Sequence, residues 1–161
     1  MSTAGSTVPA LRRISVLGVR SGHGPQGIPI NRSAKAAGVE ATALAADFVL
    51  TVVHGDRQLR LTPEQLAAMP QHTAVLPIAC VEGWSAIGQW QGPQLSQVLS
   101  MAGLLPQAKF IVFHCADVLE GRPYYESIDL ADAFHPQTIL ALAMNGAPLS
   151  VGHGAPLRLR V

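Results

Sequence analysis

The sequence predicts an α+β fold with a mixed sheet, built as one domain. Strand-like and helix-like segments alternate irregularly along the 161 residues, so they do not form the regular strand–helix–strand series of a doubly wound fold. The GHGPQG segment at residues 22–27 has the composition of a loop. Hydrophobic residues make up 48% of the chain, which predicts a large core, and 15 glycines with 12 prolines predict many loops.

The chain divides into a tail and a domain. Ser, Thr, Gly and Pro dominate residues 1–27, which are predicted to form a tail, and the domain is expected to cover residues 28–161. Arg12-Arg13 before a short apolar stretch faintly resembles an export signal, but the stretch is too short to be interpreted as one. Because no apolar run reaches 18 residues, the sequence predicts no membrane span.

Capping residues place the elements of the first half of the chain. Ser33 is predicted to begin a short helix that Gly38 ends. Thr62, followed by Pro63 and with Gln65 at the capping-box position, predicts a second helix. Apolar and β-branched runs predict three strands in the same region, at Phe48–Val53, Gln58–Leu61 and Thr73–Ala79.

Hydrophobic periodicity places the elements of the second half. A helix is predicted over Pro93–Met101, with Gly103 after it as a stop signal. Lys109–His114 is predicted to be a short central strand, which would put Cys115 in the core. The remaining expectations are a helical turn at Asp129–Phe134, an apolar segment at Ile139–Ala143, a turn at Asn145-Gly146 and a strand at Pro156–Val161.

Charge and cysteine content exclude several classes of protein. The chain has 11 basic and 10 acidic residues and a net charge of +1, so no binding of nucleic acid or of an acidic membrane is predicted. Charged residues make up only 13%, about half the usual share, which favours a large core or a surface that meets a partner. Neither Cys80 nor Cys115 lies in a CxxC motif, so the sequence predicts no disulfide scaffold, zinc knuckle or c-type haem.

Three stretches carry residues that could perform chemistry. Cys80 follows a strand and begins a loop rich in Gly and Trp, although a buried cysteine acting as a small hydrophobe would look the same. Tyr124 and Tyr125 precede a short strand, where packing is the simpler interpretation. His153 and Arg158 lie five residues apart among Gly and Pro and could bind a phosphate, or form a turn with a surface ion pair.

The order and spacing of these stretches resemble the molybdopterin-binding domain of the sulfite oxidase family. The resemblance covers residues 28–161 and depends on CVEGWS with the later WQG, on YYESIDLADA, and on MNGAPL with HGAPLRL. Within the family, the chain is most similar to bacterial catalytic subunits that reduce methionine sulfoxide and to their membrane-linked relatives. The family continues beyond PLRL, so the resemblance implies the mixed-sheet fold of this family without its C-terminal part.

The resemblance implies roles for seven residues. Cys80 would supply a thiolate to the molybdenum of a molybdopterin cofactor, and thiolate is a ligand that suits a soft, redox-active metal site. Tyr124 would lie beside the oxo ligand of the metal and assist catalysis. The other five would contact the cofactor, and they are Asn31, Arg32, Asp117, His153 and Arg158.

The resemblance implies that the activity is oxygen-atom transfer. It also implies that a partner such as a membrane cytochrome supplies the electrons, and that the parent protein is extracytoplasmic. Residues 80–90 contain no Lys or Arg but include Trp84 and Trp90, which favours reduction of a neutral S-oxide or N-oxide. The alternative is a cofactor-free binding module or an inactive fragment of the same fold. Because the terminal strand would have an open edge, the chain is also predicted to be unstable or homo-oligomeric by itself.

Overall fold

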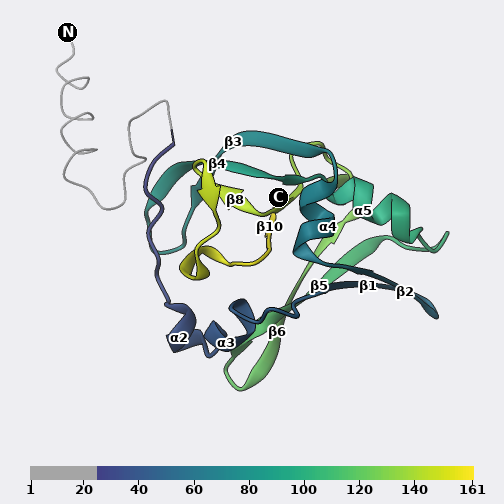
Figure 1. The fold of residues 1–161 in the computed structure, drawn as a ribbon, viewed down its shortest axis with the longest axis horizontal. Helices are drawn as coiled ribbons and strands as arrows, with labels where there is room; N and C mark the ends of the chain where they lie inside the picture. The colour runs from purple at the N-terminus through teal and green to yellow at the C-terminus, as the bar shows by residue number, and fades with distance from the viewer. Residues whose placement is uncertain (1–24) are drawn as a thin grey trace, which may run out of the picture.

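The computed structural model describes residues 25–161, so nearly all of the predicted tail and the Arg12-Arg13 pair lie outside the described residues. The α+β class is confirmed (Figure 1). Within the described residues every strand pair is antiparallel. The fold thus combines helices with strands, but its sheets do not combine parallel with antiparallel pairs. No helix among the described residues is both long and apolar enough to span a membrane.

Strands and short helices follow one another along the chain. Three long hairpins join β1 (Leu50–His54) to β2 (Arg57–Leu61), β3 (Gln71–Ala79) to β4 (Ser85–Pro93), and β5 (Phe110–Leu119) to β6 (Arg122–Asp129). The short strands are β7 (Ile139–Ala141), β8 (Ala143–Met144), β9 (Ala147–Pro148) and β10 (Arg158–Arg160). The helices are α2 (Ala34–Ala37), α3 (Glu40–Ala43), α4 (Pro63–Ala68), α5 (Leu95–Ala102), α6 (Leu130–Ala133) and the 3-10 turn η1 (Val151–His153).

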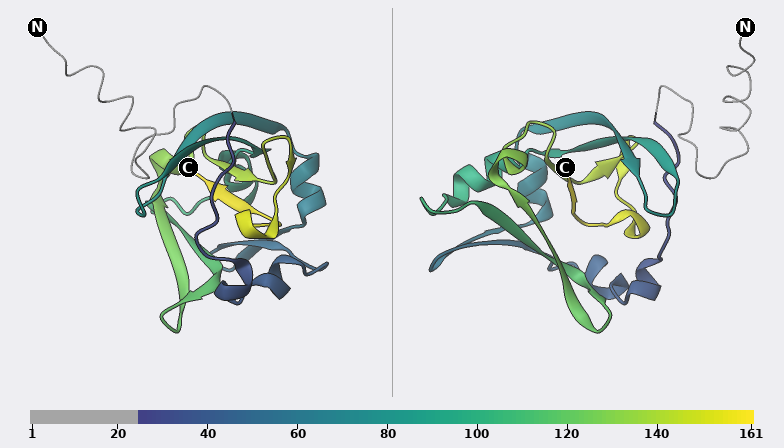
Figure 2. Two further views of the ribbon diagram at one scale, coloured as in Figure 1. Left: turned by 90° about the vertical axis from the view of Figure 1, so that its left-hand side faces the viewer. Right: turned by 180° about the vertical axis from the view of Figure 1, so that it is seen from behind.

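The hairpins enclose the C-terminal segments. The β3–β4 hairpin arches over one side of the molecule, the β1–β2 and β5–β6 hairpins run along the opposite side, and α4 and α5 lie between them (Figures 1 and 2). Strands β8 and β9 extend the β3–β4 sheet, and β10 pairs with β7. The other edge of β10 meets no strand within residues 25–161.

The predicted helix caps are confirmed. The Ser33 hydroxyl accepts the Ala36 N–H at 3.1 Å, and Gly38 ends α2 with a φ of 75°, a left-handed conformation that glycine adopts without strain. Thr62 and Gln65 form both bonds of a capping box at the start of α4. These local signals therefore specify the start of α2 and α4 without help from distant residues.

Strand β4 was not predicted, because its residues were interpreted as a loop and the beginning of a helix. Ala86, Gly88 and Trp90 alternate with less buried neighbours, which is the period-2 pattern of a strand. Glycines within this stretch lower its β-propensity and conceal the pattern. Pro93 accordingly ends a strand, and the following helix begins at Leu95 instead.

The prediction of a short central strand before Cys115 was wrong. Strand β5 extends to Leu119, and β6 is the only strand that pairs with it among residues 25–161. The pairing register shifts between His114 and Val118, and this irregularity leaves Cys115 exposed. A two-stranded ribbon can bury only one of its faces, so β5 contributes to the core through alternate residues.

Two hydrophobic clusters make up the core, and β7 joins them. Ile139 and Ala141 point into a cluster around Trp90 under the β3–β4 hairpin. Leu140, between them in sequence, points the opposite way into the cluster formed with α4 and α5. Because successive side chains of a strand alternate between its two faces, three buried residues of β7 serve both clusters.

Strands β4 and β7 cross in close contact at Gly92. A Cβ atom built on Gly92 would lie 2.0 Å from the carbonyl oxygen of Leu140 and 2.9 Å from Cα of Ala141. Both are backbone atoms of a buried strand, so neither can move away without displacing β7. Any side chain at position 92 would therefore separate the strands that connect the two clusters.

We expect Gly92→Ala to lower the free energy of unfolding by about 3 kcal/mol, the upper end of the range for overpacking a core. Denaturant unfolding of the two purified proteins measures the difference. Gly27→Ala is the matched control, because a Cβ there meets no described atom within 4 Å. Equal stability of the Gly92→Ala and Gly27→Ala variants would contradict the close crossing.

Candidate active site

Cys80 lies at the end of β3, at the beginning of the tight loop that leads into β4. The Cys80 N–H donates to the carbonyl of Trp84 at 2.9 Å, and the Gly83 N–H donates to the carbonyl of Cys80 at 2.9 Å. Gly83 has a φ of 89°, which a residue with a side chain rarely adopts. The loop thus fixes the backbone on both sides of Cys80, whose side chain is half-buried.

Two N–H groups point at the Cys80 sulfur. The amide Nδ2 of Asn31 donates to Sγ at 2.9 Å, and the backbone N–H of Glu82 approaches the same atom at 3.5 Å. The indole N–H of Trp84 donates to Oδ1 of Asn31 at 2.9 Å. The two N–H groups therefore hold the sulfur in one orientation, and Trp84 in turn fixes the Asn31 amide.

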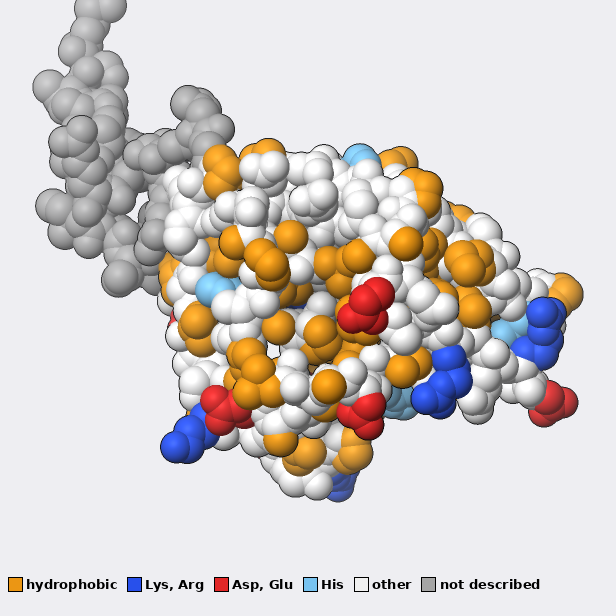
Figure 3. Space-filling view, viewed as in Figure 1, with side chains coloured by type: hydrophobic (Ala, Val, Ile, Leu, Met, Phe, Trp, Pro, Cys, Tyr) orange, Lys and Arg blue, Asp and Glu red, His pale blue; other side chains and the backbone are white. Residues whose placement is uncertain are grey.

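A cavity of about 190 Å³ opens beside Cys80. Arg158 is the cationic side chain among its lining residues, and the other lining residues are Ile28, Pro29, Asn31, Ile78, Ala79, Cys80 and Trp84. Figure 3 shows hydrophobic side chains around a hollow on one face of the molecule. The lining of the Cys80 cavity is itself mostly apolar, with one sulfur, one amide and one positive charge.

Arg158 is held over Trp90 rather than in an ion pair. Its guanidinium carbon lies 5.1 Å from the centre of the Trp90 ring, and Nη1 donates to the carbonyl of His153 at 3.1 Å. No carboxylate within residues 25–161 forms a salt bridge with it. Burial lowers the pKa of the Arg158 guanidinium from its usual value, and the charge of nearby Arg160 lowers it further. An unpaired, partly desolvated cation of this kind attracts an anion.

His153 has both ring nitrogens engaged by this chain. Nε2 lies 2.9 Å from the carbonyl oxygen of Ile28, which can only accept, so Nε2 carries a proton. Nδ1 lies 2.8 Å from the Ser150 hydroxyl, which donates to it when the ring is neutral. The structure therefore places His153 next to Arg158. Both ring nitrogens that could contact a phosphate already have partners in this chain, Ser150 and Ile28.

The remaining predicted residues do not line the cavity. Arg32 is exposed, precedes α2, and donates to the carbonyl of Ala36 in that helix at 3.1 Å. Asp117 lies in the irregular part of β5, and Tyr124 lies opposite on β6. The Tyr124 hydroxyl donates to the carboxylate of Glu126, and this bond raises the pKa of Tyr124 above its usual value. Asp117, Tyr124 and Glu126 thus form a group on the β5–β6 hairpin.

Two contributors to the Cys80 site were not predicted in their observed roles. The sequence offered Trp84 only as an apolar residue favouring a neutral substrate, yet its indole orients the Asn31 amide. The backbone N–H of Glu82, a residue not among the predicted site residues, approaches the sulfur. A hint lies in the residue type of Trp84, because a tryptophan beside a polar loop needs an acceptor for its N–H.

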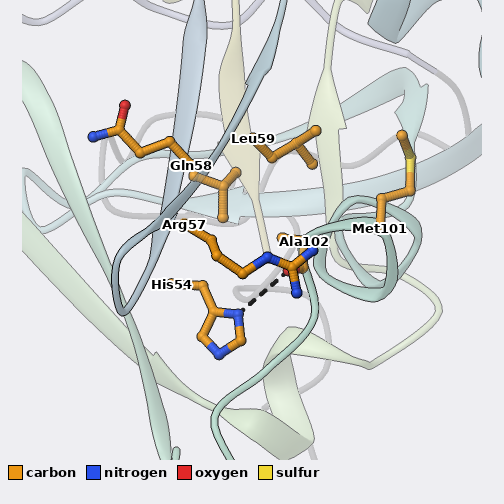
Figure 4. Close-up of a pocket in the computed structure, with 7 residues that line it drawn as sticks. His54, Arg57, Gln58, Leu59, Met101 and Ala102 are labelled. Carbon is orange, nitrogen blue, oxygen red and sulfur yellow. Dashed lines mark hydrogen bonds between the residues drawn. The ribbon is translucent and has the colours of Figure 1, made fainter.

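A second cavity, of about 90 Å³, lies between the β1–β2 hairpin and the end of α5 (Figure 4). The Nδ1 atom of His54 lies 3.3 Å from the carbonyl of Ala102, and Nε2 is buried without a partner among the described residues. None of the residues predicted for the site lines this cavity.

A family profile described as the oxidoreductase molybdopterin binding domain matches residues 36–161. The chain belongs to this family. The match begins beyond Asn31 and Arg32 and includes Cys80, Asp117, Tyr124, His153 and Arg158. The family supports the fold, the cofactor class and the oxidoreductase function that the sequence motifs implied.

Similar proteins are oxidoreductases. A protein of Azospira oryzae named as a subunit of protein-methionine-sulfoxide reductase is 44% identical over 100 residues, covering 62% of this chain and 36% of that protein. The protein-methionine-sulfoxide reductase catalytic subunit of Xanthomonas axonopodis is 34% identical over 108 residues (61% and 34%). The mitochondrial sulfite oxidase of Drosophila melanogaster is 33% identical over 138 residues (71% and 24%).

A solved structure shares the fold. The sulfane dehydrogenase SoxCD of Paracoccus pantotrophus superposes with a TM-score of 0.64 at 23% identity, covering 71% of this chain and 33% of that chain. The likeness supports the sulfite oxidase type of fold. The chain spans about a third of the length of the first two curated relatives.

The residues around Cys80 fit a molybdopterin cofactor. A thiolate held by two N–H donors is a suitable ligand for molybdenum, since soft thiolates suit redox-active metals. Arg158 reaches the same cavity with its charge unpaired, as a phosphate-binding arginine requires. The apolar walls could exclude water from a reacting centre. The donor set therefore agrees with the cofactor that the family binds.

Cys115 provides a prediction that separates the two cysteines. Burial raises the pKa of the Cys115 thiol, and the charges of Asp117 and then Glu126 raise it further. Because the thiolate is the reactive form, a raised pKa leaves less of it at each pH. In a Cys80→Ser background, we expect half-maximal alkylation by iodoacetamide at a pH above about 8.5, the usual thiol value.

Mass spectrometry of the alkylated protein across pH measures that midpoint. Asp117→Asn combined with Glu126→Gln should move it back toward the usual value, because both negative charges are removed. A midpoint at or below the usual value, or one that the double substitution leaves in place, would show that the carboxylates do not act on Cys115.

Proposed function

We propose that this domain binds molybdopterin at the Cys80 cavity and, within its parent protein, reduces a neutral S-oxide by oxygen-atom transfer. The observation that supports this most directly is the convergence of Asn31, the Glu82 N–H and Arg158 on one apolar cavity at Cys80. The family match supports the cofactor, and the names of two relatives support the substrate class.

Each residue has a separate task in this proposal. The bound cofactor supplies the two-electron oxygen-transfer chemistry. Cys80 anchors the metal through its sulfur, and Asn31 with the Glu82 N–H holds that sulfur in one orientation. Arg158 holds the phosphate of the cofactor, because its charge has no carboxylate partner in the described residues. The roles first expected for Tyr124, Asp117 and Arg32 remain proposals, and they would need these residues to approach the cofactor from outside the observed cavity.

The substrate side of the site favours a neutral molecule. The loop after Cys80 carries Glu82, which is exposed, and no basic residue until after Trp90. Val81 is fully exposed beside it, and Trp84 forms an apolar wall. An anion would gain little attraction from such a loop, whereas a thioether S-oxide has an apolar part to bury. Reduction would carry one oxygen atom away from sulfur with two electrons and two protons, and would release water.

The electrons for this reaction must come from another component. Two relatives are named as subunits, and we infer that the parent protein works with an electron-transfer partner such as a membrane cytochrome. An extracytoplasmic location of the parent protein is part of the same proposal. Association with a second copy through the unpaired edge of β10 would form a homo-oligomer, which light scattering would detect.

We expect Cys80→Ser to abolish molybdenum binding and to leave the fold intact, because serine offers a hard oxygen in place of the soft sulfur. The measurement is elemental analysis of protein produced in a host that makes the cofactor, with circular dichroism as the check on folding. Cys115→Ala is the control and should retain its molybdenum, since Cys115 is exposed on the β5–β6 hairpin. Molybdenum retained by the serine variant would refute Cys80 as the ligand.

The substrate class is tested on the full-length, metal-loaded parent protein with artificial electron carriers. We expect methionine sulfoxide reduction to show a higher kcat/KM than sulfite oxidation, because residues 80–90 lack a cation. Faster turnover of sulfite would contradict the proposed substrate class and reverse the proposed direction. Wild-type protein without molybdenum would instead identify the domain as a cofactor-free binding module.

A further inference from the structure

Residues 26–31 form a strap that passes beside the β3–β4 hairpin and leads into α2 (Figures 1 and 2). Hydrogen bonds join its first residue to β4 and its last residue to the Cys80 sulfur. At its first residue, the Gln26 N–H donates to the Ile87 carbonyl at 2.7 Å, and Gln26 Oε1 accepts the Ile87 N–H at 3.1 Å. The side chain of Asn145 donates to the Gln26 carbonyl at 2.9 Å. The strap is therefore fixed to the β3–β4 sheet before it reaches the site.

The middle of the strap is attached to η1 through His153. The protonated Nε2 of His153 donates to the Ile28 carbonyl, and Ser150 fixes the other side of the ring. Ile28 is itself buried, at 7% exposure, in the cluster around Trp90. The chain also passes close to Gly152, where a Cβ would lie 2.5 Å from Cδ1 of Ile30. A polar contact thus holds Ile28, and apolar contacts hold both Ile28 and Ile30.

The far end of the strap delivers Asn31 to Cys80. An indole N–H can only donate, so Trp84 must face Oδ1 of Asn31. The Nδ2 group then points at the sulfur, as observed at 2.9 Å. The position of the Nδ2 group that donates to the Cys80 sulfur thus depends on where the strap places Asn31. Asn31 lies three residues beyond Ile28, whose carbonyl accepts from His153.

We propose that His153 is a positioning residue: it clamps the strap at Ile28 so that Asn31 meets the Cys80 sulfur, and it does not itself bind the cofactor phosphate. Both ring nitrogens are engaged within the chain, whereas the adjacent Arg158 has its charge unpaired in the cavity. This inference rests on the proposed cofactor site only where it predicts molybdenum binding. The hydrogen bonds that form the clamp lie within the chain and do not need the cofactor.

Hydrogen exchange of the cofactor-free, full 161-residue chain tests the clamp. We expect His153→Ala to speed amide exchange about three- to tenfold in peptides covering residues 26–32 and 80–85, as loss of one hydrogen bond predicts. His153→Gln should restore slow exchange, because its amide can donate to the Ile28 carbonyl without carrying charge. Ser150→Ala, which only frees the ring to turn, should give a smaller increase.

Molybdenum content of the same variants separates the clamp from a phosphate ligand. We expect His153→Ala to lose both slow exchange and molybdenum, His153→Gln to keep both, and Arg158→Ala to lose molybdenum while peptides 26–32 keep slow exchange. Loss of molybdenum in His153→Gln with unchanged exchange would overturn the proposal. If His153→Ala does not fold, Ser150→Ala and His153→Gln still decide it.

The exchange arm does not depend on the proposed function. If the wild-type protein binds no molybdenum, the cofactor proposal fails, yet the clamp predicts the same exchange differences in the cofactor-free chain. If exchange at residues 26–32 and 80–85 is unchanged in His153→Ala, the clamp fails whatever the molybdenum content.

Discussion

The crossing of β4 over β7 at Gly92 is the contact on which the rest of this domain depends. Three buried residues of β7 connect two hydrophobic clusters, and they can do so only because position 92 has no side chain. The same strand β4 continues back to the loop that begins at Cys80. The close contact between the backbones of β4 and β7 joins the two clusters of the core. It therefore also sets the position of the Cys80 sulfur at the opposite end of the β3–β4 hairpin.

Charge is used sparingly, and mainly near the site. Arg158 and Arg160 both lie over Trp90, at 5.1 and 5.8 Å from the ring centre. Arg158 has no carboxylate partner within residues 25–161, whereas Arg160 donates to the carbonyl of Pro77 and to an oxygen of the terminal residue Val161. Two like charges over one indole repel each other, and burial lowers the pKa of both guanidinium groups. Two partly buried cations close together lower the stability of the fold when no anion is bound, as expected of a site that binds an anion.

Local chemistry was predictable from the sequence, and long-range placement was not. Ser33 and Thr62 specified helix starts because a cap needs only residues within one turn. Strand β4 was missed because its glycines serve close contacts with distant segments, which no local propensity reveals. The family resemblance implied that Cys80, Asn31 and Arg158 contact one cofactor, and the structure places all three at one cavity. Tyr124 lies instead on the β5–β6 hairpin, whose position depends on tertiary packing.

The strap has a consequence for the order in which the chain folds. Each long hairpin joins residues close in sequence, whereas the bonds from Asn145 and His153 to the strap span 119 and 125 residues. Closing such loops carries a larger entropic penalty than closing a hairpin, so these contacts should form last. The strap also buries little apart from Ile28, so it should be among the first segments to detach under mild denaturant. A newly made chain would then pass through a state with a formed core and an open path to the Cys80 sulfur.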